Sequence, residues 1–563
     1  MRNQRFGFIS ILLLSFILQY CASPISPSGG PRDTIPPILL ESIPIAEQVN
    51  YNEKTIKLTF DEYISSDQVK NNLVITPSTE NKYVAQVKKN SVILKFDEYF
   101  EDSTTFTFNF FKGITDITEK NPAENLILAF STGPVIDSLQ IKGRIKDLLT
   151  QELEEEITIG LYLLHDSLDY TKEKPRYFIN SDKSGTFTLR NIKSDIYKLF
   201  AFKDENNNLL FDAAEEKHAF LSDSILLESN IDSVTLNSIL LDVTPVDMLT
   251  ARPSGNYFEV RYNKAIKTYT VHNTDSLYNI YTRPNTEQDA IRFYNQAEYP
   301  DSIQTIIRAY DTLHNFSLDT VYLKFNSSNK KKEPLSLNLL PKDKSKFQDT
   351  LQLTFSFNKP ITSFNSSLIY IAADSLLKVP LDSLTPTITP SSNRNSFDIS
   401  CPFDWQAYSD SVIQIINDQL PDSVTQIEQI SRLDLVIDKG AFISVEKDSS
   451  EAITRTYNQQ LQAEVGTINY IVELTYPSFF VELIDKKFNT IQRKKNLKQG
   501  SFTQVPPGQY SLRVLIDLDQ NGAWTYGNLS ANIAPEPVYV YSKFTELRSK
   551  WDITIEDFRI DNL

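Results

Sequence analysis

Two loops rich in Asp and Asn contain the residues of this sequence that are best suited to binding a metal ion. In each loop the oxygen-bearing side chains alternate along the chain. Calcium prefers six to eight oxygen ligands, and one such loop can supply several of them. The seven candidate ligands are Asp204, Asn206, Asn208 and Asp212 in the first loop and Asp517, Asp519 and Asn521 in the second. Ca²⁺ is the one cofactor for which we find candidate ligands.

The same loops have a second interpretation as the tips of β-hairpins. Asp and Asn side chains accept hydrogen bonds from nearby backbone N–H groups and tolerate left-handed backbone, so they are common in turns that bind no metal. Neither loop has the complete spacing of an EF-hand. The first loop has Leu209 where the motif needs glycine, and Gly522 in the second loop is not followed by Glu six residues later. Both interpretations therefore stay open, with the turn the simpler one.

The sequence lacks the usual patterns of catalytic sites. Two Cys and four His leave little material for a metal centre or a Cys–His pair, and no histidine belongs to an HExxH motif. Only 15 of 563 residues are glycine, against about 7% in average proteins, and no phosphate-binding loop or nucleophile elbow is found. Paired carboxylates such as Asp61 and Glu62 are plentiful, as expected by chance in an acidic chain. We expect a protein that is not an enzyme.

A short tripeptide, Asp–Ser/Thr–apolar, recurs along the chain. It resembles the O-glycosylation acceptor of periplasmic and surface proteins of Bacteroidetes, which makes its hydroxyl residues candidate glycosylation sites. Asp–Ser is also a favourable entry to a turn or strand, so the tripeptide has a purely structural interpretation as well. The candidates are Ser138, Ser167, Ser233, Ser276, Thr312, Thr320, Thr350, Ser375, Ser383 and Ser423.

Residues 1–20 have the pattern of a secretory signal, with basic residues before an apolar run too short for a comfortable membrane span. The run ends in Leu-Gln-Tyr-Cys at Cys21, which resembles the lipobox of bacterial lipoproteins, where the cysteine is lipidated. Residues 21–36 are rich in Ser, Pro and Gly, the composition of a flexible tether. An ordinary signal peptide with an incidental cysteine is the alternative. If Cys21 carries lipid, Cys401 has no disulfide partner, and its strand-like surroundings predict a buried thiol.

Residues 37–133 alternate apolar and polar side chains over short runs, as half-buried strands do. Thr55–Phe60 and Ser91–Phe96 are two such runs, and turn-forming residues separate the runs at roughly ten-residue intervals. The order of features, from the Pro-Pro start through IKLTFDEYI and VITP to a final FST, resembles the SbsA-type Ig-like domain of bacterial surface proteins. That resemblance implies a β-sandwich and no particular activity.

An internal repeat relates residues 137–242 to residues 465–560. Both segments contain Gly-x-Phe followed by Tyr-x-Leu, and in both a tyrosine precedes the first Asp of the loop by seven residues. These pairs are Tyr197–Asp204 and Tyr510–Asp517. The layout looks like the carboxypeptidase-regulatory or transthyretin-like β-sandwich, whose members are mostly structural or adhesive spacers. The two copies lie too far apart in the chain to form a solenoid.

The middle of the chain is also strand-like. Residues 346–446 carry a weaker Ig-like pattern, and residues 246–345 form a β segment without an assigned family. The best helix signal runs from Asp410 to Leu420, where apolar residues recur at helical spacing. The fold class we predict is all-β, with several Ig-like and transthyretin-like β-sandwich domains in series after a lipoprotein signal peptide.

Net charge excludes one class of partner. With 56 basic and 72 acidic residues the formal charge is −16, and nucleic-acid binding needs clustered Lys and Arg to contact phosphates. We expect attachment to a membrane through acyl chains on Cys21 instead, since several chains on one residue give stable anchoring. The residues after Cys21 lack the acidic cluster that resembles a surface-export signal, which favours the periplasmic leaflet of the outer membrane.

The function these features favour is that of a non-catalytic, lipid-anchored cell-envelope protein of a Bacteroidetes-type bacterium. It would serve as a structural spacer or as a protein-interaction module with an envelope protein as partner. Two alternatives stay open. One is an accessory lipoprotein of an outer-membrane machine for secretion, assembly or uptake. The other is a carbohydrate-binding surface lipoprotein, in which exposed aromatic rings would stack on sugars.

Overall fold

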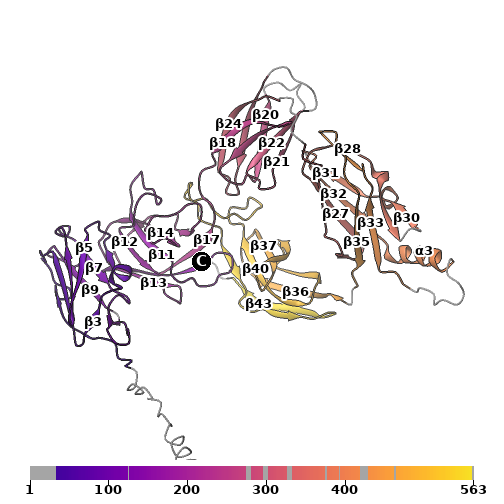
Figure 1. The fold of residues 1–563 in the computed structure, drawn as a ribbon. Coiled ribbons are helices and arrows are strands. Elements are labelled where there is room, and N and C mark those ends of the chain that lie inside the picture. The colour runs from indigo at the N-terminus through magenta and orange to yellow at the C-terminus, as the bar shows by residue number, and fades with distance from the viewer. Residues whose placement is uncertain are drawn as a thin grey trace, which may run out of the picture.

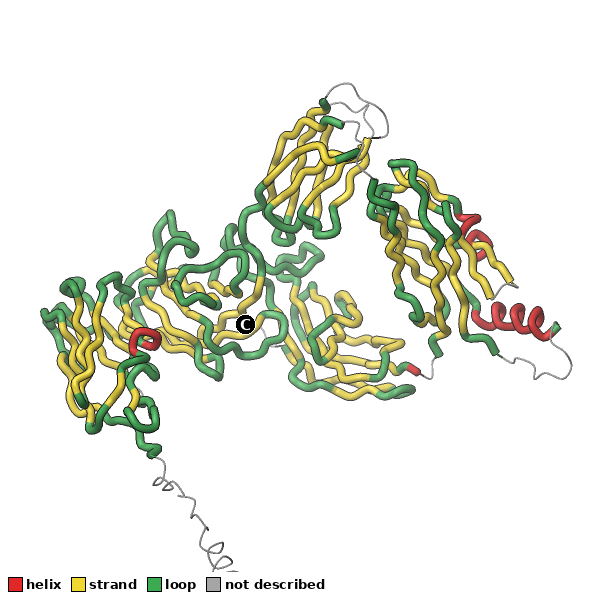
Figure 2. Tube along the Cα trace, in the orientation of Figure 1, coloured by secondary structure: helices red, strands yellow, loops and turns green. Residues whose placement is uncertain are grey.

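The structure, a computed structural model, is built mainly of β-sheets (Figures 1 and 2), which confirms the all-β prediction. Cys21 and the predicted signal peptide lie outside the described residues. Among the residues described, no helix is long and apolar enough to cross a membrane. The structure describes residues 33–124, 126–273, 280–295, 302–325, 332–373, 377–391, 393–418, 429–461 and 464–560.

The first unit is a sandwich of two main sheets, with strand orders β1-β2-β6-β5 and β4-β7-β9. The alternation of polar and apolar residues along the strands produces this sandwich. The sequence of β2 is TIKLTF, and every second side chain is buried. Aromatic rings such as Phe100, Phe108 and Phe130 fill the space between the sheets. The elements are β1 (Leu39–Ile43), β2 (Thr55–Phe60), β3 (Ile64–Ser65), α2 (Val69–Asn72), β4 (Val74–Thr76), β5 (Tyr83–Lys88), β6 (Ser91–Phe96), β7 (Thr105–Asn109), β8 (Thr115–Asp116) and β9 (Ile127–Ser131).

The second and fifth units have the same order of strands and differ in one pairing, because β15 pairs with β17 in the second unit whereas β41 and β43 of the fifth belong to separate sheets. In the second unit β10 pairs antiparallel with β13 and parallel with β17, and in the fifth β36 pairs in the same way with β39 and β43. The elements of the second unit are β10 (Leu139–Asp147), β11 (Thr158–Leu163), β12 (Tyr177–Asn180), β13 (Thr186–Ile192), β14 (Ile196–Phe202), β15 (Lys217–Phe220), β16 (Ile225–Leu226) and β17 (Ile231–Leu240). Those of the fifth are β36 (Gly466–Glu473), β37 (Phe479–Asp485), β38 (Thr490–Lys495), β39 (Gln499–Val505), β40 (Gly508–Ile516), β41 (Val538–Val540), β42 (Thr545–Leu547) and β43 (Asp552–Arg559).

The third unit is a small sandwich, with sheets β18-β19-β22-β21 and β20-β23-β24. Its core is made by alternate side chains of these strands, such as Val260, Phe293 and Ile307. Its strands are β18 (Met248–Ser254), β19 (Tyr257–Tyr262), β20 (Thr268–Asn273), β21 (Ile280–Pro284), β22 (Ala290–Asn295), β23 (Ile303–Tyr310) and β24 (Phe316–Leu323).

The fourth unit combines two larger sheets with one helix. The helix α3 begins at Trp405, earlier than predicted, because the Asp404 carboxylate accepts hydrogen bonds from the N–H groups of the next turn. The elements are β25 (Leu337–Leu340), β26 (Lys346–Phe347), β27 (Thr350–Phe357), β28 (Ile361–Phe364), η1 (Ser366–Leu368), β29 (Ile369–Ala373), β30 (Leu377–Pro380), η2 (Leu381–Leu384), β31 (Thr387–Pro390), β32 (Ser396–Pro402), α3 (Trp405–Asn417), β33 (Arg432–Ile437), β34 (Phe442–Ser444) and β35 (Ile453–Gln459).

The fifth unit packs against the second, so the chain folds back on itself (Figure 1). Strands β37 and β40 are buried on both faces, although a surface sheet of a sandwich needs burial on one face only. Their inward side chains form the core of the fifth unit, and their outward side chains contact the second unit. One apolar cluster spans this interface and contains Leu148, Ile239, Phe480, Leu515 and Val538. We call the outward face of β37 and β40 the fold-back face.

A second shared cluster adjoins the first, and Leu241 and Tyr526 belong to both. Aromatic residues of the second unit, including Phe200, pack with Tyr526 and Leu529 of the fifth unit and Leu313 of the third. Polar contacts accompany the packing. The Asn532 side chain donates to the carbonyl of Ser222 at 2.6 Å, and the Asn528 side chain donates to the carbonyl of Leu313 at 3.1 Å. The fifth unit therefore holds the second and third units in place.

The first and second units are also joined by specific contacts. The Ser78 N–H donates to the carbonyl of Arg176 at 2.7 Å, and the Arg176 guanidinium pairs with Glu101 at 2.8 Å. The Thr107 hydroxyl donates to the Asn191 side chain at 3.1 Å. These bonds fix the orientation of the first unit on the second.

His218, on β15, is buried beside the rings of Phe200 and Phe211. Burial lowers its pKa from 6.5 to about 4, because the charged imidazolium would lose its hydration. The unfolded chain therefore binds the proton first, and stability falls as pH drops from 6.5 towards 4. Across that window we expect the wild-type chain to lose about 3 kcal/mol more stability than His218→Leu.

Urea unfolding of both proteins at pH values from about 7 to about 4 tests this prediction. The slope of the unfolding free energy against pH should follow from the difference in bound protons between the two states. His272→Leu, which removes an exposed histidine, is the control. Identical pH profiles for wild type and His218→Leu would contradict the prediction.

Candidate functional site

The first Asp/Asn loop, between β14 and β15, forms a self-capped turn. Both carboxylate oxygens of Asp204 accept backbone N–H bonds, from Asn208 at 3.1 Å and Leu209 at 2.9 Å. The side chains of Asn206, Asn208 and Asp212 accept N–H bonds from residues two positions further along the chain. Each candidate ligand of this loop therefore has a structural role in the turn.

The second loop, between β40 and β41, is arranged differently. Asp517 is buried, and its Oδ2 accepts from the Ser478 hydroxyl at 2.6 Å and from the Gly522 N–H at 3.0 Å. Gly522 has a φ of +92°, a conformation that favours glycine. Asn521 donates its amide to Asp519 at 2.8 Å, and its own oxygen accepts from the backbone. Asn521 therefore orients Asp519.

A third carboxylate, Glu536, joins the two aspartates. Among the described residues, Asp517, Asp519 and Glu536 are the only group of three or more Asp, Glu, His or Cys whose candidate ligand atoms all lie within 4.8 Å of one another. We call these three residues the acidic cluster. Glu536 is 7% exposed and Asp517 is 1% exposed. The Oδ1 atom of Asp517 is buried without a hydrogen-bond partner.

Glu536 also closes the loop. Its Oε1 accepts the N–H of Leu518 at 2.6 Å, and its Oε2 accepts the N–H of Thr525 at 2.7 Å. The ring nitrogen of Trp524 donates to the carbonyl of Glu536 at 3.2 Å. The carboxylate is therefore held in position by the backbone it caps.

Glu536 belongs to neither Asp/Asn motif, but the internal repeat contains a signal that points to it. β14 and β15 pair Phe202 with His218, and β40 and β41 pair Leu515 with Val538. Two residues before His218 and Val538 stand Glu216 and Glu536. Glu216 accepts the N–H of Glu205, as Glu536 accepts that of Leu518. An alignment of the copies by strand register would have placed both glutamates beside their loops.

The electrostatics of the acidic cluster keep Asp517 charged. Burial alone would raise the pKa of Asp517, but hydrogen bonds from Ser478 and Gly522 outweigh burial and hold the pKa below its usual 3.8. The ammonium of Lys495 donates to the carbonyl of Gly522, in the same loop, at 3.1 Å. In the first loop, burial raises the pKa of Glu216.

The candidate glycosylation sites are mostly on the surface. Ser276, Ser375 and Ser423 lie outside the described residues, and Thr350 is half-buried. The exposed candidates are Ser138, Ser167, Ser233, Thr312, Thr320 and Ser383. Exposure is necessary for modification, and these six positions meet that condition.

Cys401 is fully buried, and burial raises the pKa of its thiol to about 11. It is therefore a poor nucleophile.

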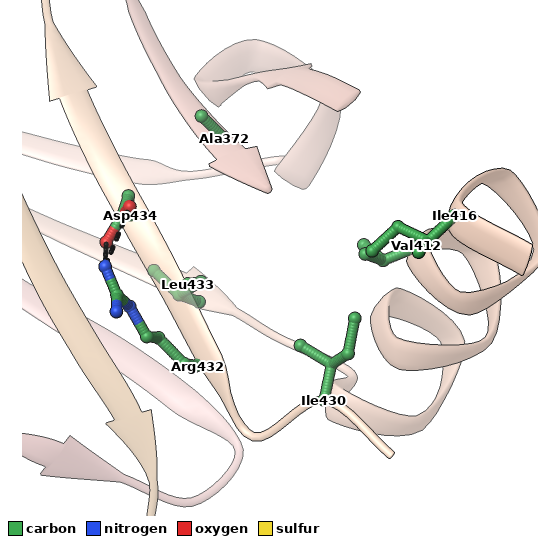
Figure 3. Close-up of a pocket in the computed structure, with 7 residues that line it drawn as sticks. All are labelled: Ala372, Val412, Ile416, Ile430, Arg432, Leu433 and Asp434. Atoms are coloured by element: carbon green, nitrogen blue, oxygen red, sulfur yellow. Dashed lines mark hydrogen bonds and ion pairs between the residues drawn. The ribbon is translucent and has the colours of Figure 1, made fainter. Parts of the chain in front are cut away.

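A cavity of about 270 Å³ opens between α3 and β33 in the same unit (Figure 3). Aliphatic side chains such as Val412 and Ile416 line it, with one ion pair between Arg432 and Asp434 at 3.4 Å. These described walls supply apolar volume and no nucleophile.

Comparison with known proteins identifies the first unit. Residues 33–132 match the family of bacterial Ig-like domains. This match confirms an Ig-like fold at the start of the described chain. No curated protein matches the sequence.

Solved structures of surface proteins are only distantly similar. Domains 1–6 of the surface layer protein SbsC are 10% identical, with 92% of this chain and 67% of that chain covered and a TM-score of 0.14. The major pilin subunit BcpA of Bacillus cereus is 8% identical, with coverages of 74% and 99% and a TM-score of 0.13. The SGBP-B protein of Bacteroides ovatus, solved with a mixed-linkage heptasaccharide, is 10% identical, with coverages of 64% and 86% and a TM-score of 0.17. At these scores no conclusion about this chain follows.

Proposed function

We propose that this chain is a non-catalytic, lipid-anchored protein of the outer membrane that acts as a structural spacer or protein-interaction module. The observation that carries the proposal is the fold-back packing of the fifth unit on the second. Domains joined only by flexible linkers move independently, whereas large apolar contacts fix their geometry. Here, shared apolar clusters and hydrogen bonds join the second, third and fifth units into one frame. Such a frame holds its own surfaces at set distances from one another.

Exposed strand edges give this frame a means of contacting partners. β5 is an edge strand of the first unit, and Val84 on it is 55% exposed. An edge strand presents unpaired backbone groups to which an extended segment of a partner can add. We propose that an envelope protein is the partner and that the acyl chains of Cys21 supply the membrane attachment.

Replacement of the lipidation site tests the anchor. When the full-length gene is expressed in a Bacteroidetes host, wild-type protein should lack residues 1–20, gain the mass of acyl chains and partition into the detergent phase. Cys21→Ala should lose both the added mass and the partitioning, because no thiol remains to be acylated. Cys401→Ala removes the other cysteine and should behave as wild type. Unchanged partitioning of Cys21→Ala would refute the lipid anchor.

A pull-down from native membranes in mild detergent distinguishes the roles. A spacer or interaction module should bring down an envelope protein in stoichiometric amount, or no partner. Co-purification with an integral barrel would favour an accessory subunit of a secretion, assembly or uptake machine instead. Retention of polysaccharide without a protein partner would favour a carbohydrate-binding lipoprotein. Protease treatment of intact cells reports the leaflet, and we expect protection, consistent with the periplasmic side.

A further inference from the structure

We propose that the acidic cluster of the fifth unit, Asp517, Asp519 and Glu536, binds a calcium ion. This inference is independent of the proposed function, since it concerns a site within one β unit. It rests on three observations: an unpartnered buried oxygen, the convergence of three carboxylates, and the contrast with the first Asp/Asn loop.

The unpartnered oxygen is the Oδ1 atom of Asp517. This residue is 1% exposed, and its Oδ1 has no hydrogen-bond partner, although its Oδ2 has two. A buried polar atom without a partner is destabilising, and more so when it carries charge. Within the described chain no donor meets this need. Lys495, the cation beside the loop, uses its ammonium on the carbonyl of Gly522.

The convergence of like charges points the same way. One oxygen from each residue of the acidic cluster lies within 4.8 Å of the others. Three carboxylates this close repel one another, and a cation between them would relieve that repulsion. The ligand types suit a hard cation such as calcium, because all are oxygens and the cluster contains no thiolate or imidazole of the kind that zinc and copper favour.

The three carboxylates of the acidic cluster come from the two sides of one loop. Asp517 and Asp519 follow β40, while Glu536 immediately precedes the entry to β41. A bound ion would therefore fasten the loop to the start of β41. Val538, two residues beyond Glu536, belongs to the apolar cluster shared with the second unit. Calcium should in this way stabilise the edge of the fold-back contact.

The first loop provides the contrast. Asn206 stands two residues after Asp204, where the second loop has Asp519 after Asp517, so the equivalent set contains one carboxylate fewer. Both oxygens of Asp204 accept backbone N–H bonds. This loop has its hydrogen bonds satisfied without an ion, and we expect no binding there.

Terbium luminescence and calcium calorimetry on the full chain test the proposal. Terbium has the oxygen preference of calcium, and Trp524, bonded to the Glu536 carbonyl, is placed to sensitise its emission. We expect saturable emission that excess Ca²⁺ quenches, and one calcium site with a dissociation constant of about 10⁻⁴–10⁻³ M, as in extracellular calcium modules. Calcium should also raise the midpoint of thermal unfolding.

Two variants and a control decide the result. Asp519→Asn changes an exposed residue and should abolish both terbium emission and the heat of calcium binding without loss of folding. Asp517→Asn, at a buried position, should also abolish emission and heat. Asp204→Asn, in the first loop, should bind as wild type. Absence of heat and emission in the wild type would overturn the proposal. Binding that survives Asp519→Asn, or that is lost in Asp204→Asn, would overturn it too. None of these outcomes bears on the lipidation of Cys21, which the proposed function requires.

Discussion

Glu482→Ala is expected to lower the free energy of unfolding of the fifth unit by about 3–5 kcal/mol. Glu482 lies on the fold-back face and is fully buried, and its carboxylate pairs with Arg513 at 2.7 Å and with Arg493. The Arg513 side chain is itself only 8% exposed. Removal of the carboxylate leaves this guanidinium buried without a counter-charge, which costs more than the pair contributes when intact. The Arg493 side chain is 51% exposed, so water can solvate its charge when Glu482 is absent.

Hydrogen exchange of the β37 and β40 amides measures this effect, because it reports the local free energy of opening within a multi-domain chain. Glu546→Ala breaks an exposed pair with Arg548 and should cost less than about 1 kcal/mol. The double replacement Glu482→Leu with Arg513→Leu should recover most of the loss, because no charge is left buried. A loss for Glu482→Ala no greater than that for Glu546→Ala would contradict the buried pair.

Leu515→Asp is expected to separate the fifth unit from the second and to cost about 3–5 kcal/mol in stability. Leu515 is 2% exposed and lies on the fold-back face, opposite the core side chains of β40. Its contacts include Leu148 and Ile239 of the second unit. The substitution removes apolar burial and puts a carboxylate among apolar side chains, so solvation of the charge requires the two units to part.

Limited proteolysis and hydrogen exchange detect the separation, since Leu148, Ile239 and their neighbours would become accessible. Leu249→Asp places the same charge at a position that is 59% exposed and should leave both measurements unchanged. If Leu515→Asp behaves like Leu249→Asp, the fold-back contact does not exist in solution.

Much of the fold could be predicted because each strand carries its own signal. The alternation in TIKLTF identifies β2, and the tyrosine, leucine and loop residues around Tyr197 and Tyr510 identify two related units. The start of α3 was missed because it depends on one cap, Asp404, rather than on periodicity. The Asp and Asn loops were found as sequence motifs, but motifs do not show which side-chain oxygens stay unpartnered.

The fold-back contact and the place of Glu536 in the acidic cluster were missed for a shared reason. In β37, FFVELID has apolar residues on both faces, with Glu482 between Phe480 and Ile484 on the outward one, which shows that the strand is covered twice but not what covers it. Glu536 lies 19 residues after Asp517, and only strand pairing between β40 and β41 brings the two together. Both features depend on contacts between segments that are distant in sequence.

The measurement that tests the fold-back packing most directly is cross-linking of the second unit to the fifth in dilute monomer. Asn532 donates to the carbonyl of Ser222 at 2.6 Å, so cysteines at these two positions, in a Cys21→Ala background, should be joined quantitatively by a short bis-maleimide. Mass spectrometry should find this one linked peptide pair. Ser222→Cys with Ser383→Cys, which pairs the second unit with the fourth, is the control and should stay unlinked. Failure of the Ser222–Asn532 pair to link, or linkage only between separate molecules, would contradict the packing of the fifth unit on the second.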